Sequence, residues 1–239
     1  MSALHMIELQ IDQLALLRFL HLQGLDTSAD QDLGYGVHAW MGAAFGELAP
    51  KPWRLLVGRG RPPRVLGYAP HDAQDIRLRL EEFADPSVLA VCPPERVASR
   101  PMPHWRQGRH LAFEVQACPV GRKAGSGVEK DVFLIRADST GGEIRRDAVY
   151  CDWAREQIER NGAARVTSIR LDGFRLIRQV RRSQGAAGER KRSHLVRPQA
   201  LFRGELTVAE PEAFESLLAH GVGRHRSFGY GMLLLRPPS

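Results

Sequence analysis

Tyr35 and His38, in the segment GYGVHAW, are the first residues whose types and spacing could do chemistry. A separation of three places both on neighbouring positions of one helical face, where Gly42 and Gly46 would let a ligand backbone approach closely. Histidine exchanges a proton near neutral pH, and tyrosine can orient a hydroxyl or stabilise developing charge. We therefore predict a proton-transfer pair, although a surface histidine beside an edge tyrosine would show the same pattern.

A strongly basic segment, RQVRRSQGAAGERKRSH (178–194), is the second candidate site. It holds one acid, Glu189, and six basic residues: Arg178, Arg181, Arg182, Arg190, Lys191 and Arg192. A hairpin with this density of arginine can straddle a nucleic-acid groove and grip phosphates. We predict an RNA stem clamp, and a merely solvated hairpin is the alternative.

A glycine-rich segment, GVGRHRSFGYG (221–231), is the third candidate site. A predicted helix precedes it and a predicted strand follows it, which is the reverse of the order in dinucleotide-binding and Walker loops. A small nucleotide is therefore disfavoured. The amides of glycines such as Gly223 and Gly229, with Arg224 and Arg226, could instead contact a phosphodiester backbone. The plainer interpretation is a helix-ending glycine followed by a turn.

Two similar sets of elements must position these residues. Apolar periodicity predicts strands and helices in the order β-α-β-β-α-β twice, at 5–12, 33–48, 52–60, 64–70, 72–83 and 87–101, then 109–120, 147–162, 164–182, 195–208, 211–220 and 230–237. This is the ferredoxin-like plan, which RNA recognition motifs share. We predict an α+β fold with tandem ferredoxin-like domains at 1–102 and 109–239 and a linker at 103–108.

Individual apolar positions are predicted to face the cores. Ile7, Leu9 and Ile11 alternate along the first strand, so one face of it is apolar. Ile76 and Phe83, in the helix predicted at 72–83, are expected to point inward together with Leu80 at helical spacing.

Composition limits the classes of function. The formal net charge is +7, and arginine is far commoner than lysine, which suits a polyanionic partner. Cys92, Cys118 and Cys151 form no CxxC pair, so neither a zinc site nor a disulfide framework is expected. No apolar run approaches about 18 residues and no signal peptide is recognisable, so we expect a cytoplasmic protein without a membrane partner.

Metal-activated hydrolysis is also disfavoured by the sequence. There are no paired carboxylates of the two-metal kind and no Gly-x-Ser-x-Gly elbow. What remains is metal-free chemistry on a polyanion. RNA allows it, because its own 2′-hydroxyl attacks the adjacent phosphate once a base removes the proton.

Four stretches together resemble a known family. GVGRHRSFGYGMLLL is similar to the C-terminal glycine-rich signature of CRISPR-associated endoribonucleases that process precursor CRISPR RNA, of the CasE (Cse) type in the type I-E Cascade system. GYGVHAWMGAAFGE resembles their first helix, where Tyr35-x-x-His38 matches the spacing of a tyrosine and the catalytic histidine. GRHLAFEVQACPVGRK and WAREQIERNG resemble the opening strand and next helix of their second domain. The resemblance covers nearly the whole chain.

The resemblance implies an RNA-processing role. Such a protein binds the hairpin of the CRISPR repeat and cuts at its 3′ base without metal or cofactor, leaving a 5′-hydroxyl and a 2′,3′-cyclic phosphate or 3′-phosphate. His38 would be the general base or acid, and Tyr35 would position the 2′-hydroxyl or support the transition state. The implied partners are the repeat RNA and other Cascade subunits, reached through the retained RNA. A non-cleaving RNA-binding scaffold and a DNA-binding accessory protein are the competing hypotheses.

Overall fold

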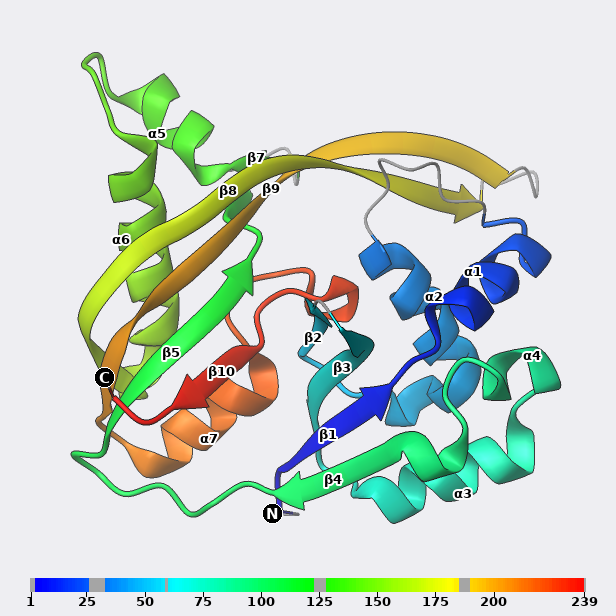
Figure 1. Ribbon diagram of the computed structural model, residues 1–239. Coiled ribbons are helices and arrows are strands. Elements are labelled where there is room, and N and C mark those ends of the chain that lie inside the picture. Colours follow the sequence, from blue (N-terminus) through cyan, green and yellow to red (C-terminus); the bar gives the residue numbers. More distant parts are fainter. Residues whose placement is uncertain (1–2, 26–32, 59, 123–127, 185–189, 239) are drawn as a thin grey trace.

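Strands and helices alternate along the chain in the computed structural model, which describes residues 3–25, 33–58, 60–122, 128–184 and 190–238 (Figure 1). Of residues 178–184 and 190–195 it describes only the backbone. The strands are β1 (His5–Gln10), β2 (Trp53–Gly58), β3 (Arg61–Ala69), β4 (Val97–Pro101), β5 (His110–Ala117), β6 (Val120–Arg122), β7 (Glu129–Asp131), β8 (Ala164–Gln184), β9 (Arg190–Val208) and β10 (Leu233–Arg236). The α-helices are α1 (Gln13–Leu22), α2 (Leu33–Phe45), α3 (Ala73–Phe83), α4 (Pro86–Leu89), α5 (Val132–Ser139), α6 (Arg146–Ile158) and α7 (Pro211–His220). Short 3-10 helices are η1 (Gly46–Leu48), η2 (Pro94–Arg96), η3 (Arg160–Gly162) and η4 (Arg226–Phe228).

The first sheet is antiparallel and has the strand order β2-β3-β1-β4. Ile7 and Leu9 of the central strand β1 are fully buried, which confirms the predicted alternation. They pack in one cluster with apolar residues of α1, α2 and α3, among them Trp40 and Ile76. These three helices therefore cover one face of the first sheet.

The second sheet is antiparallel too, with the order β10-β5-β9-β8. Helices α6 and α7 contribute Tyr150, Trp153 and Phe214 to the cluster that also holds Phe113 and Phe202 of the sheet. Each sheet has the strand order of a β-α-β-β-α-β unit, so the predicted α+β fold with two ferredoxin-like units is confirmed. The change of sheet falls between the end of β4 and the start of β5, and the domain bounds themselves stay a prediction.

Three features of the first half differ from expectation. The strand predicted at 87–101 is a strand only at β4, because Pro86 begins helix α4 and Pro94 begins η2 before it. Helix α1 lies between β1 and α2, where no element was predicted. Phe83 was predicted to face the core, but its side chain is 64% exposed because it ends α3 beyond the last buried turn. The guanidinium of Arg79 covers the Phe83 ring at 4.1 Å instead, so the ring is partly shielded by a cation rather than by the core.

The predicted pair of long strands is confirmed as a hairpin. β8 and β9 pair from Ala164 opposite Val208 out to Gln184 opposite Arg190. Figure 1 shows this hairpin running out of the second sheet and arching over the half of the molecule that contains α1 and α2. The basic segment predicted to clamp RNA is therefore carried to the side where α2 lies.

The two halves are joined through the face of the first sheet opposite its helices. Leu66 and Tyr68 of β3 belong to the same buried cluster as Phe113 and Phe202 of the second sheet. The Tyr68 hydroxyl donates a hydrogen bond to the carbonyl of Leu233 in β10 (2.8 Å), and both groups are buried. Because a buried hydroxyl without a partner is unfavourable, this bond favours one docking position of the halves.

The glycine-rich loop after α7 lies where these halves meet. Val222 donates to the carbonyl of Gly231 (2.8 Å), which closes the loop. Gly229 has a φ of 85°, and a Cβ atom there would lie 3.0 Å from the Trp53 ring. Gly223 has a φ of 76°, and its Cβ would lie 2.8 Å from the Trp153 ring. Both the left-handed backbone and the close indole contacts require glycine at these positions.

We predict that Gly229→Ala lowers the free energy of unfolding by about 1–3 kcal/mol, because alanine is strained at a positive φ and its methyl group must displace Trp53. Urea denaturation followed by circular dichroism measures the loss.

Two matched glycines separate the causes of that loss. Gly108 has a positive φ but nothing within 4 Å of a Cβ, so Gly108→Ala reports backbone strain alone. Gly42 is exposed in α2 with open space around it, so Gly42→Ala should be neutral or stabilising. A loss for Gly229→Ala no larger than that for Gly108→Ala would contradict the role of the Trp53 contact.

Candidate active site

Helix α2 presents Tyr35 and His38 beside its buried face. Trp40, on that face, is fully buried and its indole nitrogen donates to the carbonyl of Val88 (3.2 Å), which fixes the rotation of the helix. Tyr35 and His38 remain half-exposed, and their ring centroids lie 6.4 Å apart. The predicted neighbourhood of the two side chains on one helical face is confirmed.

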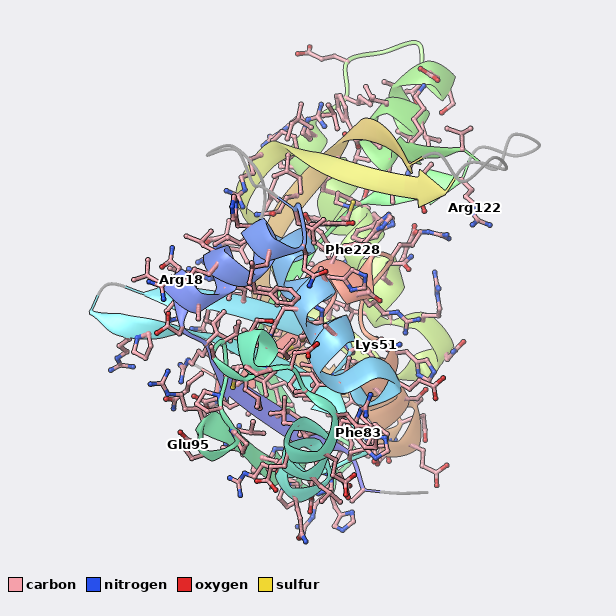
Figure 2. The ribbon with its side chains drawn as sticks, turned by 90° about the vertical axis from the view of Figure 1, so that its right-hand side faces the viewer. Arg18, Lys51, Phe83, Glu95, Arg122 and Phe228 are labelled. Atoms are coloured by element: carbon pink, nitrogen blue, oxygen red, sulfur yellow. The ribbon has the colours of Figure 1, made fainter. Side chains whose placement is uncertain are left out.

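The short helix η4 of the glycine-rich loop packs directly on this pair. The Phe228 ring lies 4.5 Å from the His38 ring and 6.3 Å from the Tyr35 ring, measured between centroids. Figure 2 shows Phe228 next to α2 and Lys51 on the same side of the molecule; Lys51 itself lies between η1 and β2. The indole nitrogen of Trp53 donates to the Ser227 carbonyl (3.1 Å), so η4 is anchored to the first sheet. Residues from the two ends of the chain thus form one site.

The environment of His38 favours the neutral imidazole. Burial lowers the pKa of His38 below its ordinary value of 6.5, and the positive charge of Lys51 lowers it further. A hydrogen bond with the Ser227 backbone opposes these effects by raising the pKa. Since the net shift is downward, most His38 rings are unprotonated at pH 7 and can accept a proton.

Lys51 brings a positive charge to the same place. Its side chain is exposed, while its backbone amide donates to the Tyr68 carbonyl (2.9 Å), so the start of the Lys51 side chain is held by the sheet. An ammonium group close to a proton acceptor can attract a phosphate and stabilise negative charge that develops on it.

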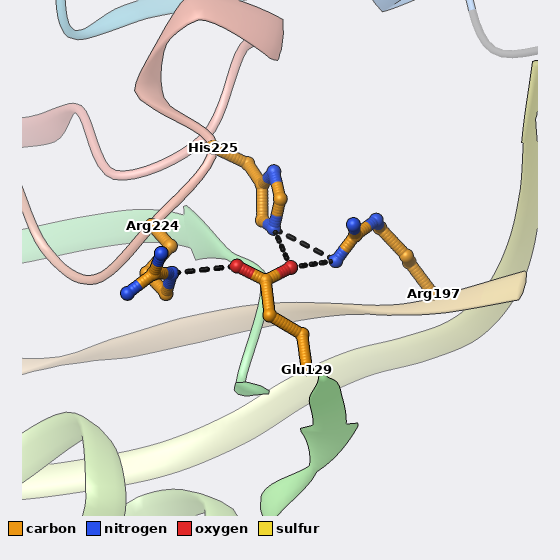
Figure 3. A network of polar contacts seen from close by, with 4 residues as sticks. All are labelled: Glu129, Arg197, Arg224 and His225. Carbon is orange, nitrogen blue, oxygen red and sulfur yellow. Dashed lines mark hydrogen bonds and ion pairs between the residues drawn. The ribbon is translucent and has the colours of Figure 1, made fainter. Parts of the chain in front are cut away.

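Arg224, predicted to contact RNA, makes an internal ion pair in this structure. Its Nε donates to Oε1 of Glu129 (2.7 Å), while Arg197 Nη1 (2.5 Å) and His225 Nε2 (2.8 Å) contact the other carboxylate oxygen, as Figure 3 shows. Burial raises the pKa of Glu129, but the hydrogen bond from Arg197 and the neighbouring positive charges outweigh it and hold the pKa at about 2. Glu129 is therefore ionised at neutral pH.

The remaining predicted contacts with RNA stay predictions. Arg226 is exposed, and its guanidinium donates to the His220 carbonyl at the end of α7 (2.5 Å). Gly223 and Gly229 lie against tryptophan rings. In the hairpin, strand pairing places Arg182 opposite Arg192, and the side chains of the six predicted clamp residues lie outside the described part of the structure.

The described residues contain neither a cluster of metal ligands nor a helix that could cross a membrane. Within these residues, no group of three or more His, Cys, Asp or Glu side chains is placed to hold a metal ion. Over the same part of the chain, no helix is long and apolar enough to cross a membrane.

Several residues of the site were missed by sequence reasoning. Phe228 and Lys51 lie far from His38 along the chain and match no local spacing, so only the fold brings them together. Glu129 and Arg197 lie in separate strands, β7 and β9, and no spacing along the chain connects them. The one available signal was the concentration of glycine, arginine and aromatic residues in 221–231, which marked the loop but not its contacts.

Comparisons with known proteins agree with this architecture. The chain is 27% identical over 189 residues to the CRISPR-associated endoribonuclease Cse3 of Thermus thermophilus, which covers 77% of this chain and 79% of that protein. A solved structure of the CRISPR endoribonuclease Cse3 bound to 19-nucleotide RNA has a TM-score of 0.66 at 23% identity, with 98% of this chain and 100% of that one covered. The CRISPR-associated protein Cas6e of Escherichia coli K-12 has a TM-score of 0.54 at 17% identity, with the same coverage.

The resemblance drawn from the glycine-rich segment and from Tyr35-x-x-His38 is confirmed at the level of the family. Residues 4–237 match the family described as CRISPR associated protein. The chain therefore belongs to the CRISPR-associated protein family.

Proposed function

We propose that this protein is a metal-independent endoribonuclease that binds the CRISPR repeat hairpin and cuts precursor CRISPR RNA at the 3′ base of the stem. The observation that carries the proposal is the environment of His38: its ring projects from α2 against η4, its pKa is lowered, and Lys51 is close by. Membership of the CRISPR-associated family and the similarity to an endoribonuclease support it. No cofactor is required by this chemistry.

In the proposed reaction, neutral His38 removes the proton from the 2′-hydroxyl of the nucleotide before the scissile phosphate. The 2′-oxygen then attacks that phosphorus, and the bond to the 5′-oxygen of the next nucleotide breaks. That oxygen takes up a proton from water and leaves as a 5′-hydroxyl, the protonated His38 returns its proton to water, and the other product ends in a 2′,3′-cyclic phosphate. RNA supplies its own nucleophile, so the protein needs to supply proton transfer and electrostatic stabilisation.

Tyr35 and Lys51 have supporting roles in this proposal. The Tyr35 ring lies on the same helical face as His38, so its hydroxyl can orient the 2′-hydroxyl or stabilise the transition state. The Lys51 ammonium disfavours protonation of His38 and would face the negative charge that develops on the phosphorane.

The basic hairpin is proposed to hold the RNA stem. It arches over the half of the molecule that carries α2, so a stem gripped by its arginines would have its base near His38. The proposed partners are therefore the repeat RNA and, through the retained product, other subunits of the Cascade complex. Related folds occur in CRISPR RNA-guided surveillance complexes, one with a TM-score of 0.57.

The first test is cleavage of a labelled repeat hairpin RNA in excess EDTA. We expect the wild-type protein to cut and His38→Ala to lower the single-turnover rate by about 10²- to 10⁴-fold, the usual contribution of a positioned proton-transfer group. A 2′-deoxy substitution at the cut site should abolish scission, because the nucleophile is then absent.

His104→Ala is the matched control for this test, because His104 is an exposed histidine outside the proposed site. Tight binding with intact RNA would favour the non-cleaving scaffold instead. Equal affinity for duplex DNA would favour a DNA-binding protein.

The pH dependence of the rate tests the charge next to His38. If His38 acts as the base, the rate rises with pH through its lowered pKa and then levels off. Lys51→Ala removes a positive charge that disfavours the imidazolium, so the pKa of His38 rises and the acid limb moves to higher pH. Single-turnover rates measured from about pH 4 to pH 9, a range that spans the ordinary pKa of histidine, follow this movement of the acid limb.

Lys51→Arg should restore the wild-type acid limb because it restores the charge. An acid limb that stays in place in Lys51→Ala would show that the lysine does not act on His38. A rate that falls as the pH rises would assign His38 the role of general acid.

Salt dependence tests the hairpin. Replacing Arg181, Arg182, Lys191 or Arg192 singly by Ala should weaken RNA binding and reduce the slope of log affinity against log salt by about one for each lost phosphate contact. Arg96→Ala, an exposed arginine on η2, should leave the slope unchanged. Unchanged slopes in all four hairpin variants would remove this segment from the RNA site.

A further inference from the structure

Glu129 holds three basic groups from different parts of the fold at one point. Arg197 belongs to β9, the strand that continues into the basic hairpin, whereas Arg224 and His225 belong to the glycine-rich loop. The carboxylate contacts Arg197 and His225 with one oxygen and Arg224 with the other. Its own strand, β7, is a third element (Figure 3). Glu129 is thus a bridge between the hairpin base and the loop.

The bridge lies directly before the turn that reaches the active site. His225 immediately precedes η4, and its φ of 63° and ψ of 30° place it in the left-handed region. The backbone of a residue other than glycine is strained in that region unless surrounding contacts hold it. Phe228 donates back to the His225 carbonyl (2.8 Å), so the conformation of His225 sets the direction of η4. It thereby sets where Ser227 and Phe228 meet His38.

Electrostatics explains why an acid is needed at this point. Arg197 Nη1 and His225 Nε2 lie only 2.8 Å apart. A carboxylate can only accept hydrogen bonds, so we assign the ring proton of His225 to Nε2, facing Glu129. Two N–H donors this close, with Arg224 beside them, repel one another unless an anion lies between them. The side chains of Glu129, Arg197 and His225 are only 14–16% exposed, so solvent screens that repulsion weakly.

We propose that Glu129 is a positioning residue for RNA cleavage: it ties the glycine-rich loop to the base of the hairpin and so holds η4 against His38. This inference rests on the proposed function for its effect on the rate. The contrasting idea is that Arg197, Arg224 and His225 form a phosphate-binding site that Glu129 merely occupies until RNA arrives. The two ideas predict different changes in affinity and rate.

The decisive variant is Glu129→Gln, which keeps the shape of the side chain and removes its charge. We expect the single-turnover rate at saturating repeat RNA to fall by about 10- to 100-fold, as for a misplacement of about 1 Å near reacting groups. RNA affinity should be unchanged or higher, because a negative charge has been removed from a basic protein. Glu95→Gln, an exposed acid on η2, is the matched control and should change neither quantity.

Arg224→Gln provides a second variant at a position where the side chain is 43% exposed. Because Arg224 contacts Glu129, Arg224→Gln should lower the single-turnover rate at saturating RNA and should have little effect on RNA affinity. The proposal is overturned if Arg224→Gln weakens binding and flattens the salt slope while Glu129→Gln tightens binding and cuts at the wild-type rate. That result would identify the cluster as a phosphate site.

A measurement without cleavage keeps this inference separate from the proposed function. The measurement is an NMR titration of ¹⁵N-labelled histidines, in which the His38 signal is identified as the one missing from His38→Ala. Glu129→Gln should move the pKa of His38 up toward 6.5, because the ring loses the burial that lowers its pKa. An unmoved His38 pKa would show that the bridge does not position η4. If the wild-type protein leaves RNA intact, the proposed function fails, and this titration still decides whether Glu129 holds the loop.

Discussion

The hydrogen bond from the Trp53 indole to the Ser227 carbonyl joins η4 of the glycine-rich loop to the first sheet. Trp53 is 1% exposed, so its N–H group would be left without a partner if η4 moved away, at a cost of about 1–3 kcal/mol. The backbone of Ser227 also makes a hydrogen bond with the side chain of His38. One peptide group therefore couples the docking of the two halves to the environment of the proposed base.

Packing reinforces this bond from both sides of the loop. Gly229 lies on the Trp53 ring and Gly223 on the Trp153 ring, so the loop is in contact with an indole from each half of the molecule. Side chains at these glycines would separate the loop from the indoles. The abundance of glycine in this segment thus has a structural cause that is independent of any contact with phosphate, and backbone amides of the loop can still serve both purposes.

Charge in this protein has two distinct uses. The net charge of +7 suits a polyanionic partner, but Arg197 and Arg224 are directed inward to Glu129, and Arg226 is bonded to the end of α7. Arginine count alone therefore overstates the surface available to RNA. The hairpin and the loop share the same residue type because guanidinium groups bind carboxylates and carbonyls as readily as phosphates.

Local patterns predicted the main strands and helices of the two units better than the contacts between them. Alternation at Ile7 and Leu9 and helical spacing in α2 reflect burial on one face, which sequence records directly. Helix α1 was missed because Leu14 and Leu22 are exposed while Leu16 is buried, so apolar residues surround the helix and blur its periodicity. The contact of Phe228 with His38 and the convergence on Glu129 depend on how two sheets dock, and no spacing along the chain encodes that.

The division between hairpin and active site has a consequence for turnover on the proposed function. Phosphate contacts along an RNA stem are the same before and after one bond at its base is cut, so they stabilise substrate, transition state and product alike. Such uniform binding lowers the concentration of RNA needed without accelerating the chemical step. Acceleration must come from groups that meet changing charge, which in the proposed mechanism are His38, Tyr35 and Lys51. A strong hairpin grip therefore predicts slow product release, and a protein built this way is suited to cut once and keep the RNA it has made.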